Sequence, residues 1–376
     1  MTRAHAVVDL TALAHNIAQV RAAAPGSQFL AVVKADAYGH GLVPIAKAAR
    51  AAEADWLGVA LLEEALELRA GGDEGAILAW LWTPGDPGLA PCLQAGVQVS
   101  VSAMWSLVEV TEQAAALGVL ARIHLKLDTG LSRSGASEED WEELVLAAKA
   151  LQDRGRVEVI GIWSHLANAS VAVDPTVAEQ RARFLAGVQL AREAGLEPQL
   201  LHLANSAAAF EYPDTRFDLV RIGIAMYGIS PMDPTSAQRL GLHAVMSLHA
   251  ELAHVKTIAA GQAVSYGGIW TAPEATRVGL VPVGYADGIP RAAEGAFVLV
   301  RGVRCAVLGR IAMDQFVIEL PERLGEVEAG EPVLIFGDAS TGAPTADDWG
   351  SQSGSIGYEI VTRIGARIPR HYVGAG

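Results

Sequence analysis

Short apolar runs rich in β-forming residues alternate with helix-like segments along the first 240 residues of the chain. This alternation constrains the fold more than any other feature, because each strand–helix–strand step repeats one unit of a parallel sheet. The strand-like runs are Gln28–Val33, Trp56–Ala60, Ala76–Trp80, Val97–Val101, Ala121–Asp128, Val157–His165, Leu200–Asn205 and Leu219–Ile224. Eight such runs predict a (β/α)8 barrel.

Helix-like segments lie between these runs. The clearest is Glu138–Gly155, whose apolar residues recur at helical spacing, and a first helix is predicted from Thr11 as its N-cap. A doubly wound open sheet is the alternative fold. It would bind a nucleotide through a glycine-rich loop, but no G-x-G-x-x-G follows the first strand and no G-x-x-x-x-G-K-[ST] occurs in the sequence. The barrel is therefore favoured.

The pattern changes after Gly241, where short β-like runs are separated by Gly/Pro turns and little helix is expected. The runs are Glu251–Thr257, Thr276–Val283, Ala296–Val300, Cys305–Leu308, Phe316–Leu320 and Val333–Phe336. We therefore predict two domains, a barrel over residues 1–240 and a mainly β domain over residues 241–376. The first ten or so residues are expected to pack with the second domain. Met232–Gly241, with Pro234, Thr235 and Ser236, is expected to be an exposed linker.

The charge balance and the cysteines exclude several classes of partner. Lys and Arg number 28 against 42 Asp and Glu, a net charge of −14 that disfavours nucleic acid and anionic membranes. Cys92 and Cys305 suit neither a disulfide scaffold nor a metal site, so we predict no metal. The sequence also lacks a signal-peptide core and any apolar run of about 18 residues. A cytoplasmic protein is expected.

The decapeptide VVKADAYGHG, residues 32–41, follows the first strand-like run. It places Lys34 at the carboxyl end of a strand, where α/β folds build their sites, and a glycine-containing loop leads to a helix predicted from Leu42. Apolar neighbours would desolvate the lysine amine and favour its neutral, nucleophilic form. From the residues alone, an ordinary surface lysine is the alternative.

This decapeptide resembles the cofactor-lysine signature of the alanine racemases, in which the lysine forms a Schiff base with pyridoxal phosphate. Further stretches resemble the same family in the same order, over essentially the whole chain. They are LKLDTGLSRSG, GIWSHLAN, LVRIGIAMYG, AVSYGGIW, VGYADG, RIAMDQF and GSIGYEI. The resemblance implies a pyridoxal phosphate-dependent enzyme that interconverts L-alanine and D-alanine and supplies D-alanine for peptidoglycan synthesis.

The barrel architecture predicts a phosphate site after the seventh and eighth strands. Asn205 and Ser206 follow the seventh, and the backbone around Gly223 and Ile224, which we place on the eighth, can donate to a phosphate. The resemblance assigns Ser206, Gly223 and Ile224 to the cofactor phosphate and adds two tyrosines, Tyr38 and Tyr358. A serine that caps the helix SAAAF is the alternative for Ser206.

Two further cofactor contacts are expected from the barrel interior. Arg221 is a charge within an apolar run and would be costly to bury without a partner. The resemblance places it against the pyridine nitrogen, which a guanidinium leaves unprotonated, so that the ring is a weaker electron sink. The resemblance also has His165 pack against the ring and orient Arg221; a core histidine is the alternative.

On the fifth strand His124, Lys126 and Asp128 alternate with apolar residues and so share one face. The resemblance gives Arg133, in the loop that follows, contact with the cofactor hydroxyl and the substrate carboxylate. In many racemases the lysine that matches Lys126 is carbamylated and braces this arginine. We take carbamylation of Lys126 as a hypothesis.

The second domain is expected to supply the remaining residues. Tyr266 resembles the catalytic tyrosine, Tyr285 a tyrosine near the substrate entrance, and Met313 the residue whose backbone amide holds the substrate carboxylate. In such racemases these three come from the partner subunit, so the resemblance implies a homodimer with shared sites. Racemisation needs two bases on opposite faces, and the family pattern gives Lys34 the D-face and Tyr266 the L-face.

Two other functions have the same cofactor. A decarboxylase of the barrel-plus-β type carries an acidic residue at the pyridine nitrogen, and Arg221 argues against it. A small pyridoxal phosphate-binding barrel protein lacks the β domain. The sequence departs from common family wording in WSHLANAS and in Ala312 before Met313, so serine or a broader set of amino acids stays open as substrate.

Overall fold

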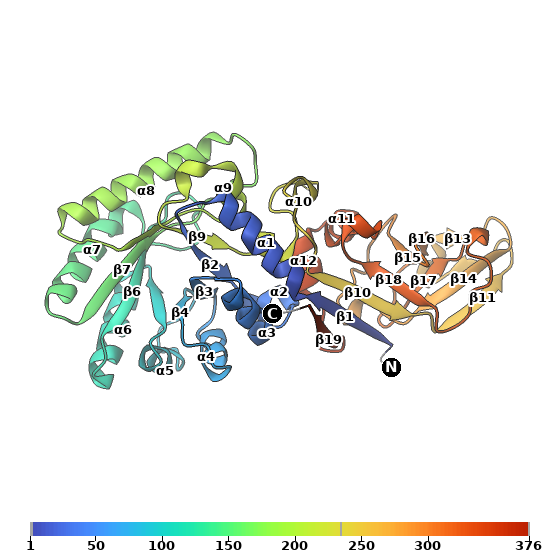
Figure 1. Ribbon diagram of the computed structural model, residues 1–376, viewed down its shortest axis with the longest axis horizontal. Helices are drawn as coiled ribbons and strands as arrows, with labels where there is room; N and C mark the ends of the chain where they lie inside the picture. Colours follow the sequence, from blue (N-terminus) through green and yellow to red (C-terminus); the bar gives the residue numbers. More distant parts are fainter. Residues whose placement is uncertain (1–2, 234, 375–376) are drawn as a thin grey trace.

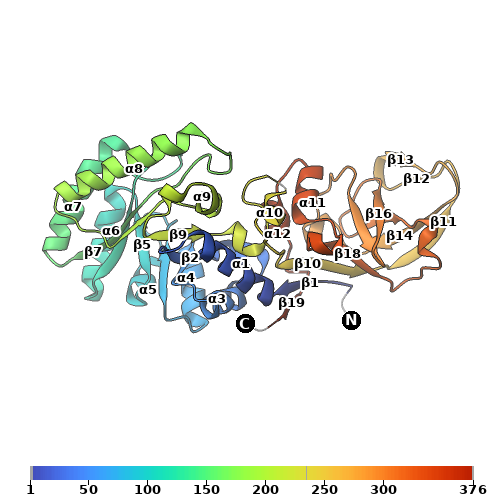
Figure 2. The same ribbon diagram turned by 45° about the horizontal axis from the view of Figure 1, so that its top comes forward.

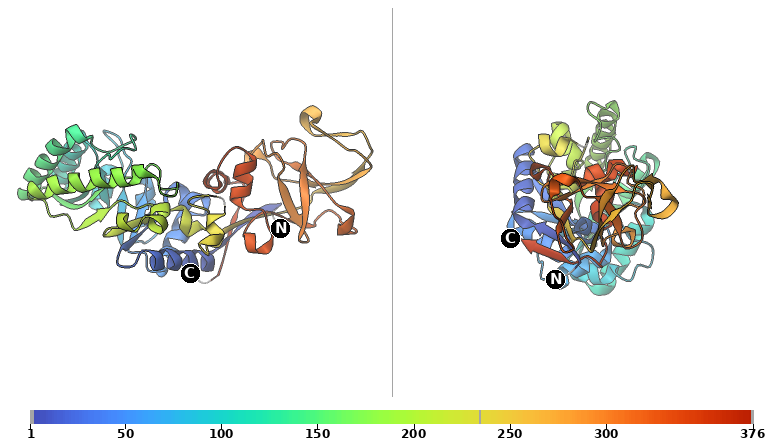
Figure 3. Two further views of the ribbon diagram at one scale, coloured as in Figure 1. Left: turned by 90° about the horizontal axis from the view of Figure 1, so that it is seen from above. Right: turned by 90° about the vertical axis from the view of Figure 1, so that its right-hand side faces the viewer.

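The computed structural model describes residues 3–233 and 235–374, so Pro234 of the expected linker lies outside the described residues. The chain forms two parts along one long axis, a barrel with helices and a mainly β part (Figure 1). Turning the molecule shows the same two parts (Figures 2 and 3). Within the described ranges no helix combines the length and the apolar character that a membrane crossing needs.

The first part is built on eight parallel strands in the order β8-β7-β6-β5-β4-β3-β2-β9. Their bounds are β2 (Gln28–Val32), β3 (Trp56–Val59), β4 (Ala76–Ala79), β5 (Gln98–Val101), β6 (Ala121–Lys126), β7 (Val157–Trp163), β8 (Leu200–His202) and β9 (Leu219–Ile222). Backbone bonds beside β8 and β9, such as that from N of Arg221 to O of Ala204 (3.0 Å), join the two ends of the sheet. The predicted barrel is confirmed.

The helices of the barrel cover the outside of this sheet (Figure 1). They are α1 (Leu10–Ala23), α3 (Leu42–Ala51), α4 (Leu62–Ala70), α5 (Leu89–Gln94), α6 (Met104–Leu117), α7 (Glu138–Asp153), α8 (Pro175–Glu193) and α9 (Ser206–Glu211). Thr11 is not the N-cap of the first helix. The carboxylate of Asp9 accepts from N of Thr11 (2.8 Å) and of Ala12 (3.1 Å), so the helix begins at Leu10.

The second part contains a nine-stranded sheet in the order β11-β14-β17-β16-β15-β18-β10-β1-β19. The bounds are β1 (Ala4–Asp9), β10 (Met246–Glu251), β11 (His254–Ile258), β14 (Thr276–Val281), β15 (Phe297–Val300), β16 (Val303–Leu308), β17 (Phe316–Glu319), β18 (Pro332–Phe336) and β19 (Arg370–Val373), with the separate hairpin β12 (Ala263–Val264) and β13 (Trp270–Thr271). Helical pieces are α10 (Ser236–Arg239), α11 (Ala346–Gln352) and α12 (Gly357–Thr362). Ser236 is fully buried at the start of α10, so the expectation of an exposed linker is wrong at this residue.

The predicted strand Glu251–Thr257 is right for β11 from His254 onward, but it wrongly includes Glu251, the last residue of β10. N of Leu252 donates to O of Glu331 (2.9 Å), beside β18, whereas N of Ala253 donates to O of Leu280 (2.8 Å) in β14. The chain changes its hydrogen-bonding partner between these two residues, so β10 ends and β11 begins. Local apolar content does not reveal such an exchange of partners.

Both ends of the described chain belong to the second sheet. β1 pairs antiparallel with β10 and parallel with β19. β19 also contacts the barrel: the guanidinium of Arg370 donates to O of Gly39 (3.0 Å) and the hydroxyl of Tyr372 to O of His40 (3.0 Å). The residues that follow Lys34 therefore lie at the junction of the two parts.

Candidate active site

Lys34 opens α2 (Lys34–Gly39), a turn directly after β2 whose backbone is left-handed rather than the simple loop expected from its glycines. Ala35, Asp36, Ala37 and Tyr38 have φ of 54°, 53°, 51° and 54°. None of them is glycine, and the left-handed helical conformation costs an L-residue about 1–2 kcal/mol. Such a run persists only where surrounding contacts hold it.

Several contacts hold the turn. The carboxylate of Asp36 accepts from N of Leu42 (2.7 Å), which ties the turn to the start of α3. The partly buried ring of Tyr38 packs 4.8 Å from the buried ring of Tyr227. At Gly39 an added Cβ would lie 2.4 Å from the carbonyl oxygen of Val361 in α12, so only glycine allows this approach. The position of Lys34 is thus fixed from both parts of the molecule.

Lys34 is partly buried and lies in a positively charged setting. Burial lowers the pKa of Lys34, and the nearby Arg133 lowers that pKa further. Arg133 itself is exposed in the loop after β6. A lowered pKa raises the fraction of lysine that is neutral near neutral pH, and the neutral amine is the nucleophilic form.

Arg221 on β9 is 5% exposed and forms no ion pair with a carboxylate of the described residues. Its guanidinium donates to carbonyl oxygens instead: those of Ser164 (2.8 Å), His202 (2.9 Å) and Leu203 (3.0 Å). Burial lowers the pKa of Arg221 to about 9, which still leaves the group protonated at neutral pH. The site therefore contains a permanent buried cation.

His165 lies beside this cation, with its Nδ1 3.3 Å from the guanidinium of Arg221. A guanidinium can only donate, so Nδ1 accepts and the proton of the neutral ring lies on Nε2. Burial, and then Arg221, hold the pKa of His165 well below its usual value. The expected pairing of His165 with Arg221 is present, and the imidazole is neutral.

A cradle of hydrogen-bonding groups follows β8 and β9. The hydroxyl oxygen of Ser206 accepts from N of Gly223 (3.1 Å) and N of Ala225 (3.4 Å). An added Cβ at Gly223 would lie 2.4 Å from the hydroxyl oxygen of Tyr38, so the tyrosine hydroxyl rests against this glycine. The ring of Tyr358 lies 6.5 Å from that of Tyr38. Hydroxyls and amides thus converge at one place.

Two details of the cradle differ from expectation. Gly223 and Ile224 do not lie on the strand, because β9 ends at Ile222. The cap of α9 is Asn205, whose side-chain oxygen accepts from N of Ala208 (3.1 Å), so Ser206 is not the capping residue. The capping alternative for Ser206 is therefore wrong, and its hydroxyl faces Gly223 instead.

Lys126 is buried at the carboxyl end of β6, and its amine donates to the hydroxyl of Ser134. Burial, followed by Arg221 and Arg133, lowers the pKa of Lys126 to about 8. The amine of Lys126 lies 4.4 Å from the centre of the Trp163 ring, and the guanidinium of Arg221 lies 4.8 Å from it. The sequence did not point to Trp163 as a residue of the site. Trp163 is brought there by the parallel register Lys126↔Trp163, which the sequence alone does not contain.

The three site residues predicted in the second part do not join this group within one chain. Tyr266 is 71% exposed and belongs to the β12–β13 hairpin, at the end of the molecule remote from the barrel (Figure 1). Met313 is 53% exposed. N of Tyr285 donates to O of Ala312 (3.1 Å), which brings Tyr285 next to Met313. All three side chains face solvent.

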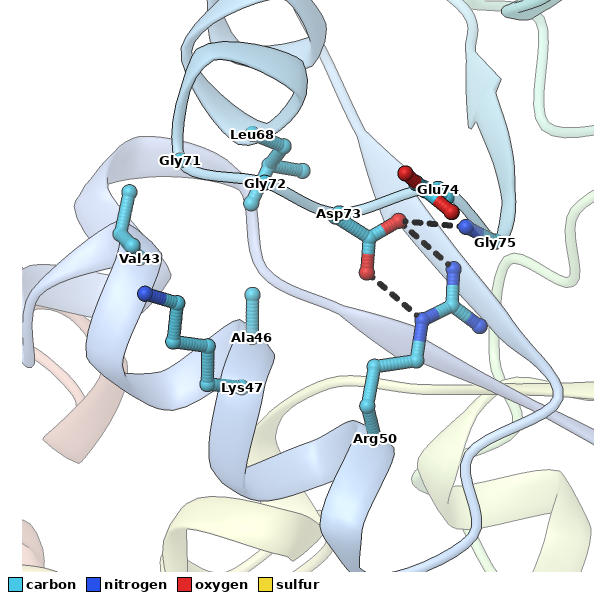
Figure 4. A pocket seen from close by; sticks show the side chains of 10 residues that line it. All are labelled: Val43, Ala46, Lys47, Arg50, Leu68, Gly71, Gly72, Asp73, Glu74 and Gly75. Atoms are coloured by element: carbon cyan, nitrogen blue, oxygen red, sulfur yellow. Dashed lines mark hydrogen bonds and ion pairs between the residues drawn. The ribbon is translucent and has the colours of Figure 1, made fainter.

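A cavity of about 350 Å³ lies on the outside of the barrel, between α3 and the loop that leads into β4 (Figure 4). Arg50 and Asp73 form an ion pair at its wall (2.9 Å). Loops from helix to strand lie at the amino ends of barrel strands, the face that supports stability rather than catalysis. We assign this cavity no role in the site.

Comparisons with known proteins agree over the whole chain. Residues 8–231 match the family model "Alanine racemase, N-terminal domain" and residues 245–372 match "Alanine racemase, C-terminal domain". The alanine racemase of Streptomyces coelicolor is 50% identical over 99% of this chain and 96% of its own, and that of Beutenbergia cavernae 49% identical over 99% and 98%. The crystal structure of alanine racemase from Streptomyces lavendulae, at 50% identity, covers 100% of this chain and 98% of its own with a TM-score of 0.97.

The contact between Gly223 and Tyr38 leads to a prediction. Gly223→Ala should destabilise the protein by about 1–3 kcal/mol, because the new methyl group overlaps the tyrosine hydroxyl. In a Tyr38→Phe background the same change should cost less, since the overlapping atom is gone. Chemical denaturation of the four proteins of this cycle measures the coupling. Equal costs in both backgrounds would contradict the contact.

Proposed function

The chain belongs to the alanine racemase family and is an amino-acid isomerase, and we propose that it interconverts L-alanine and D-alanine. In this proposal the reaction uses pyridoxal phosphate in a site shared by two subunits. The observation that carries the proposal is the convergence of Lys34, Arg221 and the cradle of Ser206 and Gly223 at the carboxyl ends of the barrel strands. The decarboxylase alternative is disfavoured by the same guanidinium.

The residues present fit this cofactor. The cradle offers the hydroxyls of Tyr38, Ser206 and Tyr358 and the amide of Ile224, together with the amide of Gly223 that now donates to Ser206. This donor set suits a phosphate. Lys34 offers an amine of lowered pKa for the aldehyde. Arg221 offers a buried cation, with no carboxylate bound to it in the described chain, for the ring nitrogen. When bound, the cofactor withdraws electrons and so acidifies the Cα–H bond of the amino acid.

The protein residues hold the substrate and move the proton. Arg133 and the backbone amide of Met313 bind the substrate carboxylate, Lys34 exchanges a proton at the D-face through Nζ, and Tyr266 exchanges one at the L-face through its hydroxyl oxygen. Arg221 would hold the ring nitrogen of the cofactor and keep its own proton, and His165 lies against the guanidinium. Asn205 supports the cradle through the cap of α9.

The exposure of the second base supports a shared site. A tyrosine that is 71% exposed and remote from the barrel of its own chain cannot meet Lys34 there. A second copy that places its Tyr266, Tyr285 and Met313 over the barrel mouth would bring both bases to one substrate and exclude water from between them. The proposal therefore includes a homodimer. The domain limits, the cytoplasmic location and the supply of D-alanine for peptidoglycan stay predictions.

The first experiment measures D-alanine formed from L-alanine by the purified protein with added pyridoxal phosphate, with L-serine tested in parallel and carbon dioxide monitored. We expect rapid interconversion of alanine without gas. In Lys34→Ala both turnover and the visible absorbance of covalently held cofactor should be lost, because the amine supplies both functions. Gas release, or full activity in Lys34→Ala, would overturn the proposal.

The shared site has its own test, in which Lys34→Ala and Tyr266→Phe proteins are mixed under conditions that allow subunits to exchange. Each variant alone should be nearly inactive. A mixed dimer contains one site with both native residues, so an equal mixture should recover about a quarter of the native activity. If Lys34 and Tyr266 acted within one chain, mixing would restore nothing.

Lys126 is suited to carbamylation, in which its neutral amine adds to carbon dioxide, forms an N–C bond and releases a proton. Its pKa of about 8 provides a neutral fraction at physiological pH. The same cations that lower this pKa, Arg221 and Arg133, would stabilise the anionic product. The modification would turn one member of a crowded positive cluster into a partner for Arg133.

We therefore expect the protein, equilibrated with ¹³C-labelled bicarbonate, to show a carbamate carbon signal that is absent from Lys126→Ala. Lys47→Ala, which removes an exposed lysine on the outer barrel surface, should keep the signal and serves as the control. High-resolution electron density for an unmodified amine at Lys126, in crystals grown with bicarbonate, would refute the modification.

A further inference from the structure

The carboxylate of Glu64, in the first turn of α4, accepts backbone hydrogen bonds from two separate segments. Oε2 accepts from N of Ala60 and N of Leu61, both at 2.9 Å, where the chain passes from β3 into the helix. Oε1 accepts from N of Ala35 at 2.5 Å, the residue directly after Lys34. The sequence reasoning did not single out Glu64, because acidic residues are common in the first turn of a helix.

The bonds from Ala60 and Leu61 are those of ordinary helix capping, in which the third residue of a helix satisfies free amides before it. The bond from Ala35 is different in kind. Ala35 lies 29 residues earlier and belongs to the preceding strand–helix unit of the barrel. Capping alone would leave Oε1 without a partner, so the hydrogen bond that Oε1 accepts from N of Ala35 requires another explanation.

That reason lies in the backbone of the turn. Ala35 is the first residue of the left-handed run, with φ of 54° and ψ of 54°. Its amide belongs to the peptide plane that follows Lys34, so holding this N–H fixes the ψ of Lys34 and the φ of Ala35. These two angles set how the lysine side chain leaves the end of β2 relative to the strained turn.

We propose that Glu64 is a positioning residue for Lys34: its carboxylate ties the amide after the lysine to the carboxyl end of β3 and thereby fixes where the amine points. This inference rests on the proposed role of Lys34 as the cofactor lysine. Glu64 touches neither substrate nor cofactor, so it acts only through Lys34.

The negative charge of Glu64 also affects the pKa of Lys34. Burial and Arg133 lower the pKa of Lys34, and the carboxylate of Glu64 raises it. Lys126 and Arg221 are further cations of this cluster. Removing the charge of Glu64 should therefore lower the pKa of Lys34 as well as loosen the turn. Loss of a helix cap alone would change stability without changing the titration of a lysine in another unit.

The test compares Glu64→Gln with Glu63→Gln in the full-length chain freed of cofactor. Glu63 is exposed in the same first turn, so its variant removes an equal charge from the same helix end. The rate at which acetic anhydride labels the amine of Lys34 is followed against pH by mass spectrometry. Amide hydrogen exchange is measured on the peptide that contains Ala35.

In Glu64→Gln we expect the labelling midpoint of Lys34 to move to lower pH and the exchange at Ala35 to accelerate, with both unchanged in Glu63→Gln. With cofactor restored, kcat should fall about tenfold or more while KM stays close to native, as for a misplaced catalytic group. A native midpoint in Glu64→Gln, or an equal shift in Glu63→Gln, would overturn the proposal. Labelling and exchange need no turnover, so they are informative even if alanine is not the substrate.

Glu64→Asp separates the effect of side-chain length from the effect of the negative charge. It also replaces Glu64→Gln as the test variant if that protein does not fold. The shorter side chain keeps the carboxylate at the start of α4 but cannot span to Ala35 as well. Exchange at Ala35 should then accelerate while the Lys34 midpoint moves less than in Glu64→Gln. Native exchange at Ala35 in Glu64→Asp would show that the amide does not depend on this bond and would reject the positioning role.

Discussion

A buried guanidinium without a carboxylate partner in the described chain is the constraint on which the site depends. Arg221 is held by three carbonyl oxygens, which orient it but do not neutralise it. Its charge and that of Arg133 both lower the pKa of Lys126. Arg133 lowers the pKa of Lys34 as well. A protein with a net charge of −14 thus concentrates positive potential at the mouth of its barrel. An anionic ligand is the natural complement of such a field.

The second constraint is geometrical. Four consecutive residues without glycine adopt a left-handed backbone directly after Lys34, and elements from both parts of the molecule hold them there. Asp36 ties the turn to α3, Gly39 lies against α12, and the carbonyl of His40 accepts from Tyr372. Because these contacts are distributed over the fold, the position of the lysine depends on the whole chain rather than on its own loop.

Most of the barrel could be predicted from the sequence, because each strand carries its own run of β-forming residues and each helix its own periodicity. The left-handed turn could not, since Ala35 and Tyr38 have no local preference for that conformation and adopt it through tertiary contacts. β1 and β19 were missed as strands because their partners are remote in sequence. Glu64 was missed because its capping role hides its contact with Ala35.

The candidate site shows the same division. The sequence identifies Lys34, Arg221 and Ser206 because each places a charge or a hydroxyl in or next to an apolar strand. The family motifs that surround them predict their roles. The contribution of Trp163 depends on which strand lies beside β6 and at what register, which no stretch of sequence contains. Interactions between units are what the sequence alone does not reveal.

The bonds from Arg370 to Gly39 and from Tyr372 to His40 also set an order of events during synthesis. The ribosome makes the lysine turn long before the strand β19 that locks it, since Arg370 follows Gly39 by 331 residues. A nascent chain can therefore form much of its barrel before β19 is made, as domains generally fold while synthesis proceeds. Its lysine turn stays unlocked until β19 has left the exit tunnel. β19 would thus complete the site that the lysine turn began.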